Sequence, residues 1–200
     1  MIEHKELKQG SPEWLAARVG KISGSKVKEI MSPRGLGKTG HTYALKILAE
    51  RLIGEPEEIP ITHAMQWGID HEDEAREIYE SFTGNVVEEI GGWELGDLWG
   101  SPDGLVGDDG IIEIKCPQPK KHLENLIAKT PDFYMAQLQF NMFVSGRRWV
   151  DFITYNPMFG NDTAMKITRV EYDQEYCEKM VERIDQLRTL IRQYNGEIFK

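Results

Sequence analysis

The segment from residue 101 to residue 117 constrains the fold more than any other part of the sequence. It reads Ser-Pro-Asp-Gly-Leu-Val-Gly-Asp-Asp-Gly-Ile-Ile-Glu-Ile-Lys-Cys-Pro, and two apolar runs flank the turn residues 107–110. This order is typical of a β-hairpin. Glu113 and Lys115 are two residues apart in the second run, so their side chains leave the same face of the strand. The hairpin therefore carries an acid and a base together, with apolar side chains on the opposite face.

An acid and a base on a buried strand face need partners, because burying an unpaired charge is costly. Asp103, on the strand before the turn, can supply a second carboxylate. Two carboxylates and an ammonium group form a small metal site with oxygen ligands, and the cation beside it can hold or deprotonate a water. One sequence pattern here resembles the core motif of the PD-(D/E)xK nucleases. It is Pro102-Asp103, followed after nine residues by Glu113-Ile114-Lys115. A surface hairpin with a simple Glu–Lys pair is the alternative, and these residues alone leave it open.

Length and composition indicate one globular domain over residues 1–200, with 40% hydrophobic and 28% charged residues. No apolar run approaches the roughly 20 residues of a membrane span, and the N-terminus lacks the pattern of a signal peptide. The only two cysteines, Cys116 and Cys177, fit a reduced cytoplasm better than a disulfide scaffold. We therefore expect a cytoplasmic protein with no membrane partner.

The charged residues are unevenly distributed along the chain. The net charge of −9 argues against a nucleic-acid partner at first sight. Residues 1–46, however, hold nine Lys or Arg and four acids, whereas residues 47–100 hold two Arg and fourteen acids. A basic N-terminal segment is compatible with a localised phosphate-binding face, while the acidic remainder would keep DNA off the outside. A solvated face of lysines would give the same counts.

Hydrophobic periodicity and turn residues predict the elements in chain order. Helices are expected over residues 12–18, 26–31, 42–52, 62–82, 133–144 and 173–194, and strands over residues 86–90, 93–99, 149–155 and 165–170. Residues 33–40 are expected to form a flexible basic loop and residues 56–60 a linker. With the hairpin, this order predicts an α/β fold with a central mixed β-sheet flanked by helices.

Two familiar motifs fail on spacing. The glycine-rich run around Lys38 looks like a Walker A loop, but Ser32 stands where that motif needs its first glycine. His71-Glu72 suggests a zinc protease, but the second histidine of that motif would fall at Ala75. The sequence therefore excludes both motifs as they are usually written.

The serines at positions 23 and 25 precede a short helix and can offer hydroxyl and N–H groups to an anion. Arg18 lies just upstream and can add a bidentate phosphate contact. Simple capping of the helix explains the serines equally well, so this segment alone does not establish an anion site.

Four short sequence motifs in this order resemble one family. They are Leu15–Gly20 running into Ile22–Ser25, Trp67-Gly68 with Glu72, Ser101–Gly104 with Glu113–Pro117, and Tyr134–Gln137. Together they resemble the phage lambda-type exonuclease (YqaJ-like viral recombinase) family of the PD-(D/E)xK nuclease superfamily, over nearly the whole chain. The resemblance implies a restriction-endonuclease-like fold. It also implies a Mg²⁺-dependent 5′→3′ exonuclease that digests one strand of linear double-stranded DNA from 5′-phosphorylated ends, leaving a 3′ overhang for recombination by strand annealing.

The resemblance implies a metal site as well. Asp103 is expected to bridge two Mg²⁺ ions, one shared with Glu113 and the carbonyl of Ile114, the other shared with Glu72. Because all these ligands are oxygens, Mn²⁺ should be able to replace Mg²⁺. Two such ions stabilise the attacking and leaving oxygens of a phosphoryl displacement.

Other residues take their expected roles from the same resemblance. Lys115 is expected to orient or deprotonate the attacking water, with a pKa lowered by burial, and Gln137 to lie near that water. Arg18 and Ser25, with Ser23, match the pocket for the 5′-phosphate of the strand that is cut.

Two further residues match contacts to the duplex. Arg34 corresponds to a DNA-tracking residue, and Met65 to an apolar wedge that splits the terminal base pair. Members of the family that resemble this chain form a ring-shaped homotrimer around DNA and work with a single-strand annealing recombinase, which implies a phage or prophage gene in a bacterial host. An endonuclease that cuts internally and a non-catalytic DNA-end-binding protein are the open alternatives.

Overall fold

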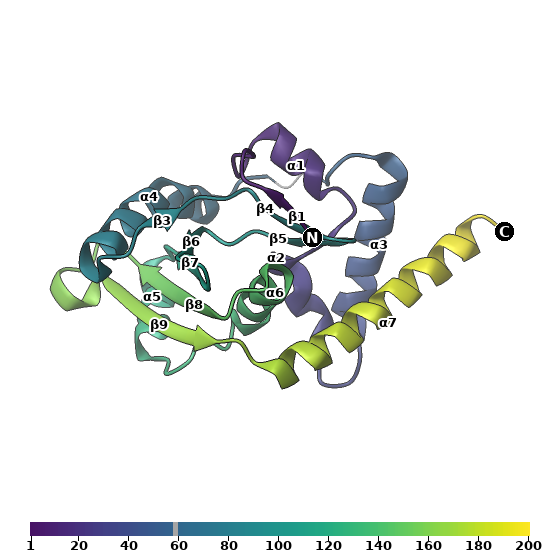
Figure 1. Ribbon diagram of the computed structural model, residues 1–200. Coiled ribbons are helices and arrows are strands. Elements are labelled where there is room, and N and C mark those ends of the chain that lie inside the picture. Colours follow the sequence, from purple (N-terminus) through teal and green to yellow (C-terminus); the bar gives the residue numbers. More distant parts are fainter. Residues whose placement is uncertain (58–59) are drawn as a thin grey trace.

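The strands of this protein form two sheets between helices, in a computed structural model that describes residues 1–57 and 60–200 (Figure 1). One sheet has the order β1 (Ile2–His4), β4 (Gly92–Leu95), β5 (Leu98–Gly100) and β2 (Ile22–Ser23). The other has the order β3 (Val87–Glu88), β6 (Gly104–Val106), β7 (Gly110–Lys115), β8 (Trp149–Tyr155) and β9 (Met165–Glu171). Both sheets are mixed, because β2 runs parallel to β5 and β7 runs parallel to β8. The predicted α/β class is confirmed, although the strands divide between two sheets.

The helices begin and end largely at the signals that the sequence carries. They are α1 (Pro12–Arg18), α2 (Gly24–Val27), α3 (Gly37–Ile53), α4 (His63–Thr83), α5 (Pro119–Ile127), α6 (Met135–Ser145) and α7 (Gln174–Ile198), with short 3₁₀ turns at Lys28–Ile30 and Asn161–Thr163. The side chains of Ser11, Thr62 and Asp173 accept backbone N–H groups in the first turns of α1, α4 and α7. Gly84 ends α4 in the left-handed conformation.

Several boundaries differ from the predicted ones. The basic loop expected over residues 33–40 is shorter, since α3 already begins at Gly37 and includes Lys38. The strand expected over residues 93–99 is a hairpin of β4 and β5, because Gly96 adopts a positive φ of 63° and reverses the chain. The linker expected over residues 56–60 includes residues 58 and 59, which lie outside the described residues.

Three elements were not predicted from the sequence. These are the short strands β1 and β2 and the helix α5. The helix α5 is nine residues long and only His122 of its side chains is buried, so its apolar residues Leu123, Leu126 and Ile127 give a short signal. It begins at Pro119, which is a favoured first residue of a helix.

Helices cover both faces of the five-stranded sheet. On one face α4 packs against β7, and the buried side chains there include Ala75, Tyr79, Ile112 and Ile114. On the other face α6 packs against β8, and α3 and α7 complete this side of the core, lying next to each other in Figure 1. The predicted alternation of β7 is confirmed, because Ile112 and Ile114 face α4 while the neighbouring Glu113 contacts α6. None of the helices in residues 1–57 and 60–200 is long and apolar enough to cross a membrane.

Candidate active site

The carboxylate of Glu113 accepts hydrogen bonds from three side chains. The residue lies on β7 and is 1% exposed. Lys115 Nζ and Gln137 Nε2 each donate to Oε1 at 2.5 Å, and Asn141 Nδ2 donates to Oε2 at 3.1 Å. Gln137 and Asn141 are four residues apart on α6, so this helix presents both amides to the strand from one face. Two elements far apart in sequence therefore fix the direction of a single buried carboxylate.

Asp103 is held against the same strand by the backbone of β7. Its N–H donates to the carbonyl of Ile112 at 3.1 Å, and its Oδ2 accepts the N–H of Ile114 at 2.6 Å. Glu72 reaches this region from α4, where its Oε1 accepts a hydrogen bond from Arg76 Nη2 at 3.2 Å. The hairpin therefore places the carboxylates of Asp103 and Glu113 near each other, as its sequence predicted.

Burial raises the pKa values of all three carboxylates. Burial, together with the charges of Asp103 and Glu72, raises the pKa of Glu113 to about 8 against the opposing charge of Lys115. Burial and then the charge of Asp103 raise the pKa of Glu72 to about 7. Burial also raises the pKa of Asp103, although the ammonium of Lys115 opposes it. The charges of Asp103 and Glu72 thus raise the pKa of a neighbouring carboxylate, because the single positive charge of Lys115 cannot balance three ionised acids.

The predicted direction of the pKa shift of Lys115 is wrong. Burial does act to lower this pKa, but the charges of Glu113 and Asp103 outweigh it and raise the pKa above its ordinary value. Burial alone would lower the pKa, as predicted, but the two neighbouring carboxylates reverse the direction. Lys115 is therefore a firmly charged ammonium in this structure.

The donor set fits a divalent cation that prefers oxygen ligands, because three carboxylates repel one another around a single ammonium. Within residues 1–57 and 60–200, no three acidic, histidine or cysteine side chains already converge into a metal-binding cluster. Glu113 is turned toward the amides of α6, and Glu72 is paired with Arg76. Either carboxylate would have to exchange a protein donor for a metal ion, so the predicted ligand set of Asp103, Glu113, Ile114 and Glu72 stays a prediction.

A cavity of about 160 Å³ connects these residues with the N-terminal helices. Its walls include two groups of predicted site residues, namely Arg18, Ser23 and Ser25 on one side and Asp103, Glu113, Lys115 and Gln137 on the other. The structure thus brings the predicted phosphate-binding residues together with the predicted catalytic residues. This juxtaposition could not be deduced from any one of the motifs.

Arg18 provides the clearest sign of an anion site in this cavity. Its Nε is buried without a hydrogen-bond partner among the described residues, and its guanidinium lies 4.0 Å from the ring centroid of Trp14. Burial lowers the pKa of Arg18, although the charges of Tyr43 and Glu50 oppose this. A buried guanidinium N–H without a partner is costly, and a phosphate oxygen would satisfy it.

The comparisons with known proteins agree with the geometry. Residues 13–148 match the YqaJ-like viral recombinase domain. An alkaline exonuclease from Laribacter hongkongensis is 33% identical, with a TM-score of 0.83 over 94% of this chain and 98% of that one. This chain belongs to the YqaJ-like viral recombinase family. Its predicted family is confirmed, and its likeness to an alkaline exonuclease supports a nuclease.

Two further solved structures have a fold similar to that of this YqaJ-like protein. The same Laribacter hongkongensis enzyme in complex with dAMP gives the same identity, coverage and TM-score. A phage related exonuclease from Haemophilus somnus shares the fold, with a TM-score of 0.75 and 17% identity over 89% of this chain and 96% of that one. No curated protein gives a significant match.

Two predicted DNA contacts of the YqaJ-like protein lie outside the cavity. Arg34 is exposed before α3, and Met65 is 46% exposed in the first turn of α4. Neither residue is among those that line the cavity. The structure therefore leaves their roles as predictions.

Two residues that shape the site, Asn141 and Gln9, were not predicted from the sequence. Asn141 lines the cavity and holds Glu113, and its position four residues after Gln137 was the available signal. Gln9 also lines the cavity, and its Nε2 donates to the carbonyls of Ile90 at 2.9 Å and Pro102 at 2.8 Å. This contact fixes the backbone just before Asp103, and no local sequence pattern reveals it.

Proposed function

We propose that this YqaJ-like protein is a Mg²⁺-dependent exonuclease. It digests one strand of linear double-stranded DNA in the 5′→3′ direction from 5′-phosphorylated ends, and it leaves a 3′ overhang for recombination by strand annealing. The observation that carries this proposal is the single cavity lined by Arg18 and Ser25 together with Asp103, Glu113 and Lys115. A buried cation for a terminal phosphate next to a hydrolytic centre suits an enzyme that starts from a strand end.

In this proposal Asp103, Glu113, the carbonyl of Ile114 and Glu72 hold the metal ions. Bound Mg²⁺ supplies charge stabilisation for the attacking and leaving oxygens of the phosphodiester, and Mn²⁺ can substitute because the ligands are oxygens. The ammonium of Lys115 orients the attacking water, and its proton can leave only when the negative charge around it is reduced.

The amide of Gln137 on α6 fixes the direction of the Glu113 carboxylate. Gln137, hydrogen-bonded to Glu113 Oε1, keeps that carboxylate aimed at the reaction centre. Its position in the wall of the cavity also lets it contact the attacking water. Its neutral amide donates a hydrogen bond without adding positive charge that would repel a cation.

The direction of digestion follows from the anion side of the cavity. Arg18, Ser25 and Ser23 hold the 5′-phosphate, and a cavity of about 160 Å³ has room for a strand end but not for a duplex. The likeness to an exonuclease whose structure was solved with dAMP supports a product of this class, since dAMP is a deoxynucleoside monophosphate. Arg34 and Met65 are proposed to contact the duplex outside the cavity.

We also propose the assembly that the family resemblance implies. Three copies form a ring around the duplex, and a single-strand annealing recombinase binds the strand that is left. A mass in solution three times the 23.0 kDa of one chain would support the ring. A monomer that digests long DNA at full rate would contradict it.

Linear and covalently closed circular duplexes, incubated with Mg²⁺, test the proposed function. We expect digestion of the linear DNA alone, and faster digestion when its 5′ ends carry phosphate than when they carry hydroxyl. Arg18→Ala should remove most of this preference, whereas Arg192→Ala, an exposed arginine on α7, should keep it. Closed circles cut as readily as linear DNA would favour the endonuclease alternative, and an unchanged preference in Arg18→Ala would remove Arg18 from the phosphate site.

A further inference from the structure

Phe133 is an exposed aromatic side chain between two lysines. It is 56% exposed. Lys28 Nζ lies 3.1 Å from the centroid of its ring, and Lys121 Nζ lies 4.7 Å from the same centroid. Both distances are within the range of a cation–π interaction. An aromatic ring that faces solvent and attracts two ammonium groups adds little to the core but is well suited to a ligand with flat rings and negative charge.

The position of this cluster connects it to the candidate active site. Phe133 lies four residues before Gln137, in the turn that leads into α6, and Lys28 lies three residues after Ser25, in the 3₁₀ turn that follows α2. Both Gln137 and Ser25 line the catalytic cavity. The helices that carry these cavity residues, α2 and α6, pack against each other. Tyr134, the neighbour of Phe133, lies close enough to Lys115 for its charge to affect that lysine. The cluster therefore lies beside the cavity.

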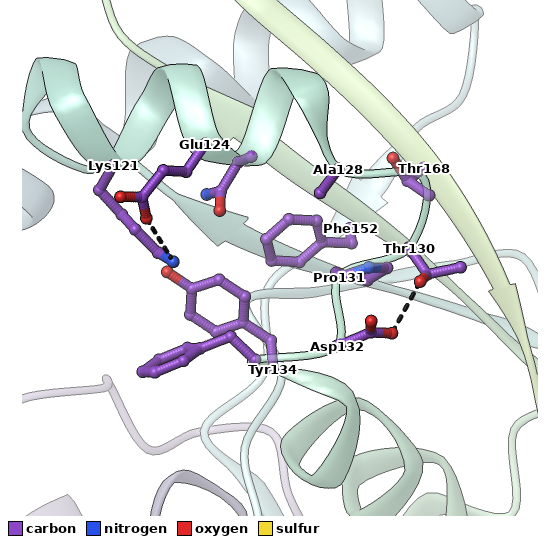
Figure 2. Close-up of a pocket in the computed structure, with 11 residues that line it drawn as sticks. Lys121, Glu124, Ala128, Thr130, Pro131, Asp132, Tyr134, Phe152 and Thr168 are labelled. Atoms are coloured by element: carbon purple, nitrogen blue, oxygen red, sulfur yellow. Dashed lines mark hydrogen bonds and ion pairs between the residues drawn. The ribbon is translucent and has the colours of Figure 1, made fainter.

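Phe133 is one of the residues that line a small recess. Figure 2 shows this recess between the helix α5 and Phe152 of β8. Its volume is about 140 Å³, and its apolar walls include Pro131, Tyr134 and Phe152. The rings of Tyr134 and Phe152 are 4.9 Å apart, and those of Phe133 and Tyr134 are 5.0 Å apart in an edge-on arrangement. Pockets for drug-sized ligands measure roughly 300–1,000 Å³, so this recess has room only for one small flat group.

We propose that Phe133, Lys28 and Lys121 form a platform for one unpaired nucleotide of the DNA strand held at the active site. The base stacks on the ring of Phe133 in place of the ammonium of Lys28, with its edge toward the recess, and the two lysines move onto the flanking phosphates. This inference rests on the proposed function, because that function supplies the DNA strand. Stacking on an aromatic ring tolerates every base, so the platform would suit an enzyme without sequence preference.

The carboxylates around the recess decide which side the phosphates take. Glu124 accepts a hydrogen bond from Lys121 Nζ at 3.2 Å, and Asp132 accepts one from Thr130 Oγ1 at 2.7 Å, as Figure 2 shows. Both acids line the recess and would repel a phosphate placed inside it. Lys28 has no ion-pair partner within the part of the chain that the structure describes. Phosphates are therefore expected on the lysine side of Phe133, with the uncharged base facing the recess.

A fluorescent base tests the platform directly. The probe is a duplex with a short single-stranded 5′-phosphorylated tail that carries 2-aminopurine, mixed with protein in EDTA so that no DNA is cut. The variants are Phe133→Leu, which removes the aromatic ring, Phe133→Trp, which keeps one, and Lys28→Gln. Phe82→Leu is the matched control, because Phe82 is 80% exposed on α4. Thermal melting of each variant establishes that it is folded.

Each variant has its own expected effect on fluorescence quenching and on DNA affinity. The unsubstituted protein should quench the fluorescence on binding. Phe133→Leu should lose most of the quench and bind the tailed DNA about tenfold more weakly, as expected for one stacked base. Phe133→Trp should restore both properties, and Lys28→Gln should reduce the salt dependence of binding by about one charge. Phe82→Leu should behave like the unsubstituted protein.

Two results would overturn the platform. One is full quenching and an unchanged affinity in Phe133→Leu. The other is an equal loss of affinity for the tailed DNA and for a blunt duplex, because the platform holds an unpaired nucleotide. A failure of the proposed function would look different from a failure of the platform. In that case the quenching would still depend on Phe133, but the protein would digest no DNA when Mg²⁺ is added.

Discussion

Glu113 is the residue on which the geometry of the site depends, because its buried carboxylate is shared between a strand and a helix. Lys115 neutralises it from the same strand face, whereas Gln137 and Asn141 add donors that carry no charge. Neutral donors orient a carboxylate without removing the negative charge that a metal ion needs. The two amides therefore fix the direction of the Glu113 carboxylate without adding positive charge to the site.

Lys115→Ala should abolish digestion and leave DNA binding in place. The variant loses the group that orients the attacking water, and general acid–base groups typically contribute about 10²–10⁴-fold to rates. The measurement is the initial rate on end-labelled duplex, with binding followed separately in EDTA. Lys120→Ala, an exposed lysine on α5, is the control. Digestion by Lys115→Ala at the normal rate would rule out this lysine as the water-orienting group.

Asn141→Leu should slow digestion about 10–100-fold, the usual effect of removing a group that orients a metal ligand. The substitution keeps the branched shape but removes the hydrogen bond to Glu113 Oε2 and the one accepted from the backbone N–H of Ser101. We expect kcat to fall and the Mg²⁺ concentration needed for half-maximal rate to rise, with DNA affinity in EDTA nearly unchanged. Asn141→Gln should recover part of the rate. Loss of thermal stability with unchanged kcat would show that Asn141 serves packing only.

The residues on the hairpin could be predicted because strand side chains alternate with a period of two, which fixes the relation of Glu113 to Lys115 without knowledge of the fold. Asn141 was not predicted, although it lies one helical turn after Gln137, because only the structure shows that this face of α6 meets β7. The pKa of Lys115 was predicted in the wrong direction for a related reason. Its neighbours Asp103 and Glu113 act through space, and their effect is larger than that of burial.

The contact between α2 and α6 links the anion side of the cavity to the catalytic side. Gly24 begins α2, and a Cβ at this position would lie 2.7 Å from Asn141 Oδ1 and 3.2 Å from Phe140 Cδ1. The amide of Asn141 also accepts the backbone N–H of Ser101 at 3.3 Å. The close contact at Gly24 therefore connects α2 to Asn141, the residue whose amide is hydrogen-bonded to Glu113.

Gly24→Ala should lower both stability and activity, because the added methyl group must displace Asn141. Overpacking of a well-packed interior costs about 1–3 kcal/mol of unfolding free energy. Urea denaturation measures the stability, and the rate on linear duplex measures the activity. Gly196→Ala is the control, since nothing lies within 4 Å of a Cβ built there. Equal behaviour of the two variants would contradict the proposed coupling.

Prediction of the elements succeeded where a helix has caps and failed where the chain reverses within a short apolar run. Thr62 and Gly84 bracket α4 in the sequence as they do in the structure. The run over residues 93–99 has strand-forming residues on both sides of Gly96, so its composition alone does not reveal a hairpin. The helix α5 was missed because it is only nine residues long and only His122 of its side chains is buried.

On the scale of the whole molecule, Asp97 joins three separate parts of the chain. It lies in the turn between β4 and β5, where its carboxylate pairs with Arg188 of α7 at 2.5 Å and with Arg51 of α3 at 3.3 Å. Burial acts to raise the pKa of Asp97, but the two guanidinium groups outweigh it and hold the pKa below its ordinary value. The folded protein therefore favours the charged form of Asp97.

Asp97→Asn should destabilise the protein at neutral pH and reduce its sensitivity to acid. A carboxylate with a lowered pKa in the folded state contributes stability above its unfolded pKa, which is about 3.9 for Asp. That contribution is lost as the pH falls through the folded value. Allowing for partial exposure, we expect a loss of about 1 kcal/mol at pH 7 that shrinks below about pH 4. Urea denaturation at both pH values measures it, and an equal loss at the two would contradict this account.

The distribution of charge over the whole molecule agrees with a restricted entry for DNA. The chain has a net charge of −9, yet Arg18, Lys28 and Lys115 all lie in or beside one small cavity. An acidic exterior repels the duplex generally, whereas the cations attract a strand end to one place. This arrangement suits an enzyme that engages DNA ends better than one that binds along its length.

The order in which the two ends of a strand are released tests the central claim most directly. A linear duplex with 5′-phosphates is labelled at either the 5′ or the 3′ terminus of one strand and incubated with Mg²⁺. If the phosphate site and the hydrolytic centre act together, the 5′ label should be released first, as a mononucleotide, while the 3′ label stays on long DNA. Earlier release of the 3′ label, or internal cutting that frees neither label, would contradict the account.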